Sequence, residues 1–297
     1  MDKHEIYFDT LYIDEAHNLF EKDYRNILLY RLIKQNKLRN PNQSILYLSP
    51  LINDSEHLKF DKNEYISKYK IEYNIKEPEY FEYRLDKTVY KYNRFTNKFY
   101  KIKTEASFYD YIKENSSKKT FIFHRRPVKT ELFAKKLADT LQEIELTKEI
   151  QSLIHILKNY VHEDFYMLDL IKKGIIYLHA KLPDQIKDYL EYQYKTIPQL
   201  KYLVANEVIL EGINLPISTM FILSTHGINE KRLTNLIGRV NRLNNIFDKN
   251  HGSLELLCPK IHFVNTTEYA GIENHMTKKI ELLRSRDFFD DIKNPLL

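Results

Sequence analysis

The sequence lacks several features that would point to common classes of protein. A single cysteine, Cys258, excludes an internal disulfide and fits a reducing cytoplasm. No apolar run approaches the roughly 20 residues of a membrane-spanning helix, so we expect a cytoplasmic protein without a membrane partner. The 11 histidines include neither an HExxH pair nor a cluster with metal-ligand spacing, which argues against a metal-dependent hydrolase.

Glycine is scarce, and no glycine-rich loop is present. The six glycines form no cluster, and no GxxxxGK[ST] phosphate-binding loop occurs in the 297 residues. Such a loop binds nucleotide phosphates through backbone N–H groups, a lysine and a hydroxyl. Any nucleotide chemistry therefore needs a phosphate loop from upstream sequence or from a partner chain.

The composition permits nucleic-acid binding without establishing it. The 46 basic residues are nearly balanced by 41 acidic ones, which leaves a net charge of +5. Tyrosine (23 residues) and phenylalanine (16 residues) could stack on bases, but packing in the core and in strands accounts for most of them more simply.

Apolar runs and helical patterns alternate along most of the chain. Residues 6–13 and 44–49 read as strands, with a helix between them that Pro41 ends. From about residue 118, the same reading gives strands at 119–124, 174–180, 200–206 and 220–225. A helix with Phe133, Leu137, Leu141 and Ile144 on one face follows the first of these strands, and further helices are expected over about 148–160, 183–194 and 232–243. This alternation predicts an α/β fold with doubly wound parallel sheets.

The chain divides by composition into three parts: 1–60, 61–116 and 117–297. The middle part is dense in Lys, Glu, Asn and Tyr, and FEYRLDKTVYKYNRFTNKFYKI partly alternates. We therefore expect a connector with a small β element, one or two hairpins, between two domains.

The tetrad Asp14-Glu15-Ala16-His17 directly follows the first expected strand. An Asp at such a strand end can hold Mg²⁺, and a Glu beside it can orient or deprotonate an attacking water. The simpler alternative is a polar exit from a strand. A metal-dependent hydrolase built on Asp14, Glu15 and His17 is a further alternative.

Arg239 and Arg242 are three residues apart and are expected on one face of a helix. Planar guanidinium groups suit phosphate oxygens and can neutralise charge on a transferring γ-phosphoryl group. Taken alone, such a pair is more often a solvated helix face.

Together, these motifs resemble those of a superfamily 2 DExH helicase, closest in wording to the superkiller-like branch. The match to motifs II, III, IV, IVa, V and VI rests, in that order, on DEAH (14–17), LSPLIND (48–54), FIFHRRP (121–127), LHAKLP (178–183), VANEVILEGINLP (204–216) and NLIGRVNR (235–242). The resemblance covers most of the chain except about 60–116 and the C-terminal tail.

The resemblance implies two RecA-like domains, the first truncated (1–60) and the second complete (117–297), which together bind ATP and act on DNA or RNA. Asp14 would hold Mg²⁺, Glu15 would activate water, and His17 and Ser49 would couple the nucleotide site to the motor. The remaining implied ATP-site residues are Gly212, Asn235, Gly238, Arg239 and Arg242, with Glu211 and Asn214 near the domain interface. Arg125, His179 and Asn206 would face the nucleic-acid backbone.

Three positions depart from the family pattern, and the phosphate loop is missing. Motif III has Ser49-Pro50-Leu51 instead of Ser-Ala-Thr, Asn206 replaces a threonine, and Asn235 replaces a glutamine. Pro50 lacks an N–H and stiffens the backbone, which affects the coupling motif. We expect the C-terminal two-thirds of a helicase that needs upstream sequence or a partner chain for hydrolysis. The alternative is an inactive remnant that only binds nucleic acid or protein.

Overall fold

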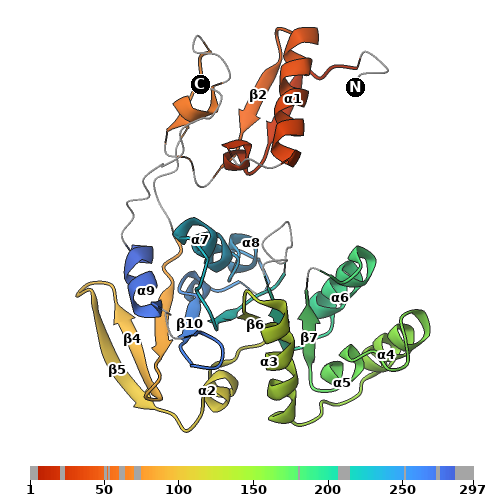
Figure 1. Ribbon diagram of the computed structural model, residues 1–297, viewed down its shortest axis with the longest axis vertical. Helices are drawn as coiled ribbons and strands as arrows, with labels where there is room; N and C mark the ends of the chain where they lie inside the picture. The colour runs from red at the N-terminus through yellow and green to blue at the C-terminus, as the bar shows by residue number, and fades with distance from the viewer. Residues whose placement is uncertain are drawn as a thin grey trace. The chain divides into compact units, whose positions relative to one another are not determined.

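The computed structural model describes residues 6–20, 24–49, 52, 54–59, 64–69, 75–179, 181–206, 215–250, 252–271 and 275–284. The described residues form two compact units (Figure 1): those from 6 to 69 belong to one, called here the smaller unit, and those from 75 to 284 belong to the other, the larger unit. No helix among the described residues combines the length and the apolar character needed to cross a membrane.

The smaller unit is a strand–helix–strand motif. Strand β1 (Thr10–Ile13) pairs in parallel with β2 (Ser44–Tyr47), and helix α1 (Tyr24–Arg39) connects them. The predicted βαβ unit is therefore confirmed, and α1 ends just before Pro41, as expected. Short 3-10 helices follow the strands at Ala16–Phe20 and Ser55–Leu58. The buried core among these residues is small, with Ile13, Ala16, Ile33 and Leu58.

The larger unit is built on an eight-stranded sheet. Its order is β5-β4-β3-β10-β9-β6-β8-β7, and only the pairings of β4 with β3 and β5 are antiparallel. The strands are β3 (Glu79–Tyr83), β4 (Thr88–Asn93), β5 (Lys98–Thr104), β6 (Thr120–Phe123), β7 (Ile175–Leu178), β8 (Tyr202–Ala205), β9 (Thr219–Ile222) and β10 (Lys260–Val264). The α/β class and the mostly parallel sheet are confirmed.

Helices occupy most connections between strands after β5, and the last helix follows β10. They are α2 (Phe108–Asn115), α3 (Pro127–Asp139), α4 (Lys148–Tyr160), α5 (Met167–Ile171), α6 (Asp184–Thr196), α7 (Glu230–Gly238), α8 (Leu243–Ile246) and α9 (Met276–Arg284), with a 3-10 helix at Leu254–Leu257. Helix α3 ends at Asp139, so Leu141 and Ile144, expected on its apolar face, lie beyond it. Both still pack against the core.

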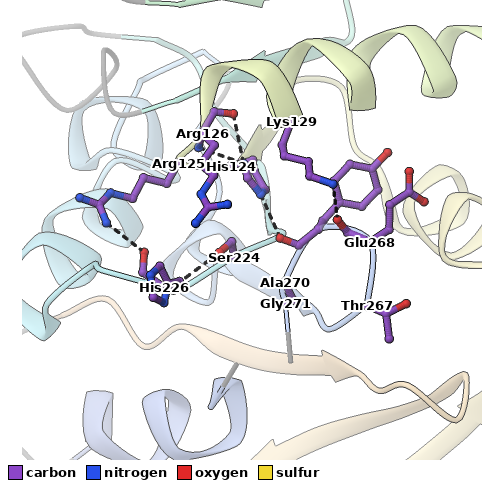
Figure 2. A pocket seen from close by; sticks show the side chains of 11 residues that line it. His124, Arg125, Arg126, Lys129, Ser224, His226, Thr267, Glu268, Ala270 and Gly271 are labelled. Carbon is purple, nitrogen blue, oxygen red and sulfur yellow. Dashed lines mark hydrogen bonds between the residues drawn. The ribbon is translucent and has the colours of Figure 1, made fainter. Parts of the chain in front are cut away.

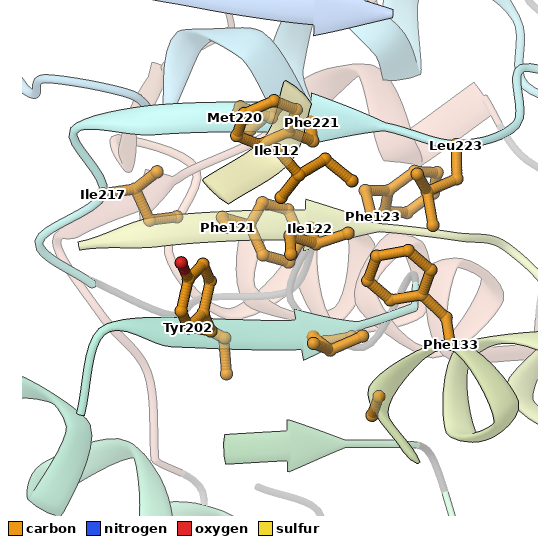
Figure 3. Close-up of a cluster of buried hydrophobic side chains, with 14 of the residues drawn as sticks. Ile112, Phe121, Ile122, Phe123, Phe133, Tyr202, Ile217, Met220, Phe221 and Leu223 are labelled. Atoms are coloured by element: carbon orange, nitrogen blue, oxygen red, sulfur yellow. The ribbon is translucent and has the colours of Figure 1, made fainter. Parts of the chain in front are cut away.

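The central strands are buried on both faces. Successive residues Phe121, Ile122 and Phe123 point to opposite faces of β6, and all three are fully buried. Figure 3 shows them with Phe133 of α3 and Ile112 of α2, which belong to the same core. Strands buried in this way read as continuous apolar runs, which is why β6 to β9 could be found in the sequence.

Two regions of the larger unit differ from expectation. Residues 79–104, expected within a connector, form strands β3 to β5 of the large sheet, because β3 pairs in parallel with β10 along its whole length. The expected hairpins are present as β3–β4 and β4–β5. Strand β10 was not predicted, although it lies between β3 and β9 near the middle of the sheet.

A histidine is buried in the middle of β10. The His262 ring stacks between Phe81 and Phe221, at centroid distances of 4.8 and 4.6 Å. Its Nδ1 lies 2.6 Å from the Tyr111 hydroxyl, and its Nε2 has no hydrogen-bond partner among the described residues. Burial lowers the pKa of His262 to about 3, so the neutral ring is the form that packs in the folded protein.

Candidate functional site

The acidic tetrad forms a tight loop at the carboxyl end of β1. The Glu15 N–H donates to Asp14 Oδ1 over 2.8 Å, and the Ala16 N–H donates to the Leu48 carbonyl over 2.9 Å. Glu15 has φ +50, in the left-handed region that non-glycine residues seldom occupy. The loop therefore has a defined backbone conformation, and it leaves the Asp14 side chain exposed.

His17 connects this loop to the segment after β2. Its Nδ1 lies 3.1 Å from Ser49 Oγ and 3.4 Å from Glu15 Oε2. Because β1 and β2 are parallel neighbours, their carboxyl ends bring residues about 30 positions apart into contact. His17 thus joins the two loops of the smaller unit, through a hydrogen bond to Ser49 and a close contact with Glu15, whose Oε2 is buried and has no hydrogen-bond partner among the described residues. We call these three residues the His17 cluster.

The tetrad can contribute one carboxylate to a magnesium ion. No three His, Cys, Asp or Glu side chains converge on a possible metal position within the described residues. Mg²⁺ in nucleotide sites is nevertheless held by one or two carboxylates, with phosphates and waters as the other ligands. One Asp14 oxygen accepts the Glu15 N–H and the side chain is exposed, so Asp14 fits that limited role.

In the larger unit, the direction of the connections changes between β6 and β9. The chain leaves β6 towards β8 and β7 on one side, and it leaves β9 towards β10 on the other. Such a switch point, at the carboxyl ends of parallel strands, is where open α/β sheets bind ligands. A cavity of about 550 Å³ lies there, lined by residues 124–126, Lys129, Ser224, His226 and residues 267–271. We call it the switch-point cavity.

Positive charge predominates in the switch-point cavity. Arg125 and Arg126 follow β6 with exposed side chains, and Lys129 lies in the first turn of α3 (Figure 2). The carboxylate of Glu268, which also lines the cavity, is paired with Lys136. Helix α3 begins at Pro127 and adds the positive end of its dipole. The cavity therefore favours an anion.

A buried histidine joins two walls of the cavity. The Arg126 N–H lies 3.0 Å from His124 Nδ1, and His124 Nε2 lies 3.0 Å from the Tyr269 carbonyl. A neutral ring with the proton on Nε2 satisfies both contacts, and burial lowers the pKa of His124, which favours that form. His124 thus fixes the loop after β6 against the loop after β10.

Gly227 shapes the third wall. It has φ +70, and a Cβ there would lie 1.7 Å from Arg125 Nη1. The same Nη1 lies 3.5 Å from the His226 carbonyl. A glycine at this turn therefore allows the Arg125 guanidinium to lie against the loop after β9.

The other predicted nucleic-acid residues emerge at the same sheet edge but do not line the cavity. His179 follows β7 and Asn206 follows β8, and these strands are in register at Leu178 and Ala205. His179 Nε2 lies 3.2 Å from the Tyr166 hydroxyl, its Nδ1 accepts the Lys181 N–H, and Asn206 is buried. Burial lowers the pKa of His179.

The prediction that Arg239 and Arg242 share one helix is wrong. Helix α7 ends at Gly238, and Arg242 precedes the first residue of α8. Val240 forms a parallel bridge with Ile217, and Lys76 Nζ donates to the Gly238 and Val240 carbonyls over 2.8 and 2.6 Å. These tertiary contacts draw the chain out of the helix.

The surroundings of the two arginines also differ. Arg239 is 8% exposed, whereas Arg242 is half-buried. Burial, and then the charge of Arg242, lower the pKa of Lys76 to about 8. A Cβ at Gly238 would meet nothing within 4 Å, so that glycine serves no close approach within the described residues. Asn235 lies half-buried in α7.

The predicted residues Gly212, Glu211 and Asn214 lie outside the described residues. Sequence reasoning found Arg125 but missed His124, Lys129, His226 and Tyr269 in the same cavity. A doubled arginine at a strand end was a usable signal for Arg126. The loops after β9 and β10 are about 100 and 145 residues away, and no local pattern links them to β6.

Comparison of the sequence with protein-family models and with curated proteins gives no match.

Proposed function

We propose that the chain is part of a superfamily 2 nucleic-acid motor, an ATP-dependent helicase or translocase of DNA or RNA. The larger unit is then its second RecA-like domain, and the smaller unit belongs to the first. The observation that carries the proposal is the cationic cavity at the switch point of the larger sheet. Its arginines come from the segment that resembles motif IV, where a nucleic-acid contact is expected.

The switch-point cavity supports binding of a phosphodiester backbone. Arg125 and Arg126 offer planar donors that match phosphate oxygens, and the N-terminus of α3 offers N–H groups and a positive dipole. Backbone contacts of this kind supply most sequence-independent affinity, which makes binding sensitive to salt. Because both DNA and RNA have a phosphodiester backbone, both are substrates under this proposal.

The His17 cluster in the smaller unit supports a hydrolytic role. Asp14 would hold Mg²⁺, which when bound neutralises charge on phosphates. Glu15 would orient an attacking water, and His17 would couple its loop to the loop of Ser49, which its side chain contacts. The phosphate loop comes from sequence outside these 297 residues.

A second function, nucleic-acid binding without hydrolysis, is favoured by the position of Arg239. An arginine that stabilises a transferring phosphoryl group must reach it, but the Arg239 side chain is buried beside the end of α7. Hydrolysis by a form that includes a phosphate loop separates the two functions. Turnover that nucleic acid stimulates supports the motor, and binding without any turnover supports the second function.

The binding role is tested with the double variant Arg125→Ala, Arg126→Ala. We expect its affinity for a labelled single strand of about 16 nucleotides to fall about tenfold or more, with a salt slope smaller by about 1.4. The matched control is Lys135→Ala, Lys172→Ala, which removes the same charge from surface ion pairs elsewhere in the unit. Equal losses in both double variants would show a general charge effect and contradict the proposed site.

A further inference from the structure

The β4–β5 hairpin is an unusually basic and aromatic element. Between residues 84 and 104, seven side chains are Lys or Arg and one is Asp, and five are Tyr or Phe. The whole chain has a net charge of only +5, so this short element has a charge unlike that of its surroundings. None of the helicase-like motifs includes it.

The hairpin places rings and cations side by side on an exposed edge. Strand β5 is the outermost strand of the sheet, and within the described part of the chain it pairs with β4 alone (Figure 1). Lys91 lies opposite Tyr100 and Asn93 lies opposite Lys98, so these four residues share one face. Tyr100 is 49% exposed, and Phe95, in the turn, is 83% exposed.

Part of this charge is available to a partner. Glutamates hold Lys91, Arg94, Lys103 and Arg84 in ion pairs, the first two through Glu79 and Glu77. Exposed Lys87, Lys98 and Lys101 have no ion pair among the described residues. Lys98 and Lys101 flank Tyr100 along the edge strand. Lys98, two residues before Tyr100, lies on the same face as the ring, whereas Lys101, next to it in sequence, lies on the other face of the edge strand.

A second cavity lies beside these residues. Its volume is about 400 Å³, and Arg94, Phe95, Tyr100, Lys91 and Cys258 are among the residues that line it. Cys258 lies just before the first residue of β10, and Glu79 is the first residue of β3. This cavity is therefore at the amino edge of the parallel strands. The switch-point cavity is at the opposite, carboxyl edge, one strand length or about 17 Å away. The two surfaces are separate.

Protection of a free sheet edge explains some of these features but not all. Lysines on an edge strand discourage pairing with other chains, and Lys98 and Lys101 serve that purpose whatever binds. Exposed ring faces and an adjoining cavity do not protect an edge. Rings that alternate with cations are the arrangement by which proteins bind unpaired bases and the backbone that connects them.

We propose that the β4–β5 hairpin binds single-stranded nucleic acid, with bases stacked on Phe95 and Tyr100 and phosphates along the edge strand, near Lys98 on the face of the ring and Lys101 on the other face. The occupant is a polyanion because lysines without ion pairs remain at the edge, and its bases are unpaired because a base within a duplex cannot stack on a protein ring. Arg94 lies over one face of Phe95, 4.9 Å from the ring centroid, which leaves the other face for a base. This surface does not depend on the proposed motor. It adds a second contact on the opposite edge of the same sheet.

Cys258 gives a direct test because it is the sole cysteine, is exposed and lines this cavity. The rate of its modification by N-ethylmaleimide, an uncharged reagent, is measured with and without oligothymidylate or oligouridylate of about 16 nucleotides. We expect both strands to slow the reaction severalfold. The slowing should persist in the Arg125→Ala, Arg126→Ala variant, which separates this surface from the switch-point cavity.

Ring variants test stacking. Phe95→Ala and Tyr100→Ala should each weaken strand binding about tenfold and abolish the protection of Cys258. Tyr160→Ala, which removes an 85% exposed ring from the end of α4, is the control and should change neither. Lys98→Ala with Lys101→Ala should reduce the salt slope by about 1.4. Because Phe95 is so exposed, its loss should not affect folding, which thermal unfolding checks.

Three outcomes would overturn the proposal. The first is an unchanged rate of Cys258 modification at saturating oligonucleotide. The second is protection by heparin, a polyanion without bases, that equals protection by the oligonucleotides and that the ring variants do not reduce. This result would indicate an acidic partner of another class. The third is protection that disappears only in the Arg125→Ala, Arg126→Ala variant. If the DNA strand and the RNA strand protect Cys258 to different extents, the more protective one is the kind of nucleic acid that this surface binds.

Discussion

The larger and the smaller unit differ in how firmly they hold the residues assigned to them. In the larger unit, β6 and β9 lie inside a sheet that is buried on both faces, and their loops are tied together through His124. In the smaller unit, β1 and β2 pair only with each other among the described residues. Their facing residues Tyr12 and Leu46 are 73% and 48% exposed.

This difference indicates which of the two proposed activities, nucleic-acid binding or hydrolysis, depends more on the rest of the protein. Binding cations stand on a rigid scaffold, so affinity should survive changes elsewhere in the chain. The His17 cluster lies on a unit of two strands and one helix, and so small a unit has marginal stability by itself. Hydrolysis should therefore respond to whatever else contacts the smaller unit, whereas binding should not.

Arg242→Ala should have the largest effect, because it removes a guanidinium assigned to the transferring phosphoryl group. In a form that includes a phosphate loop, we expect turnover to fall by about 10³-fold or more, with nucleic-acid affinity changed by less than about threefold. Arg232→Ala, an exposed arginine on α7, is the control. The reverse pattern, with lost affinity and normal turnover, would assign Arg242 to the nucleic acid instead.

Glu15→Gln should lower turnover by about 10²- to 10⁴-fold in the same form, because the amide cannot accept a proton from water. The amide keeps the shape of the side chain, so ATP binding should be largely intact. Steady-state hydrolysis and nucleotide binding are measured on one preparation. Normal turnover would remove the water-activating role and leave the tetrad as a polar strand exit.

Phe133→Ala and Ile33→Ala compare the two cores directly. Phe133 is fully buried in the larger unit, and its truncation should cost about 3–5 kcal/mol of unfolding free energy there. Ile33 is buried in the smaller unit, and we expect a loss of about 2–4 kcal/mol that leaves the larger unit's transition unchanged. Urea unfolding followed by hydrogen exchange separates the units. A shift of the larger unit's transition in Ile33→Ala would contradict this expectation.

His262 should make the larger unit sensitive to acid. Its pKa is lowered to about 3 in the folded protein, against a usual value near 6.5, so the unfolded chain binds the proton more readily between these values. Stability is complete above about pH 6.5 and falls by up to about 1.4 kcal/mol for each pH unit below it. His262→Gln keeps a partner for Tyr111 and cannot titrate. An unchanged pH slope in that variant would exclude this cause.

The sequence predicted the elements whose signal is local. Strands β6 to β9 are continuous apolar runs, and the helix after β1 ends where Pro41 requires. Strand β10 escaped because KIHFV is short and interrupted by His262, which only tertiary stacking makes compatible with the core. The end of α7 escaped because Val240 continues the helical pattern but pairs with a distant residue, Ile217.

The candidate site follows the same division. Arg125 and the tetrad were found because their neighbours in sequence form a recognisable motif. The partners of Arg125 lie on loops more than 100 residues away, and they meet only because strand order places β9 and β10 beside β6. Strand order is a property of the whole sheet, and a local pattern does not contain it.

The central claim is that nucleic-acid phosphates bind at the carboxyl edge of the larger sheet. Hydrogen–deuterium exchange with and without a saturating single-stranded oligonucleotide tests it most directly. The account predicts slower exchange in residues 124–130, 224–228 and 266–271, three segments that are far apart in sequence and line one cavity. Unchanged exchange in all three, with the oligonucleotide bound, would contradict it.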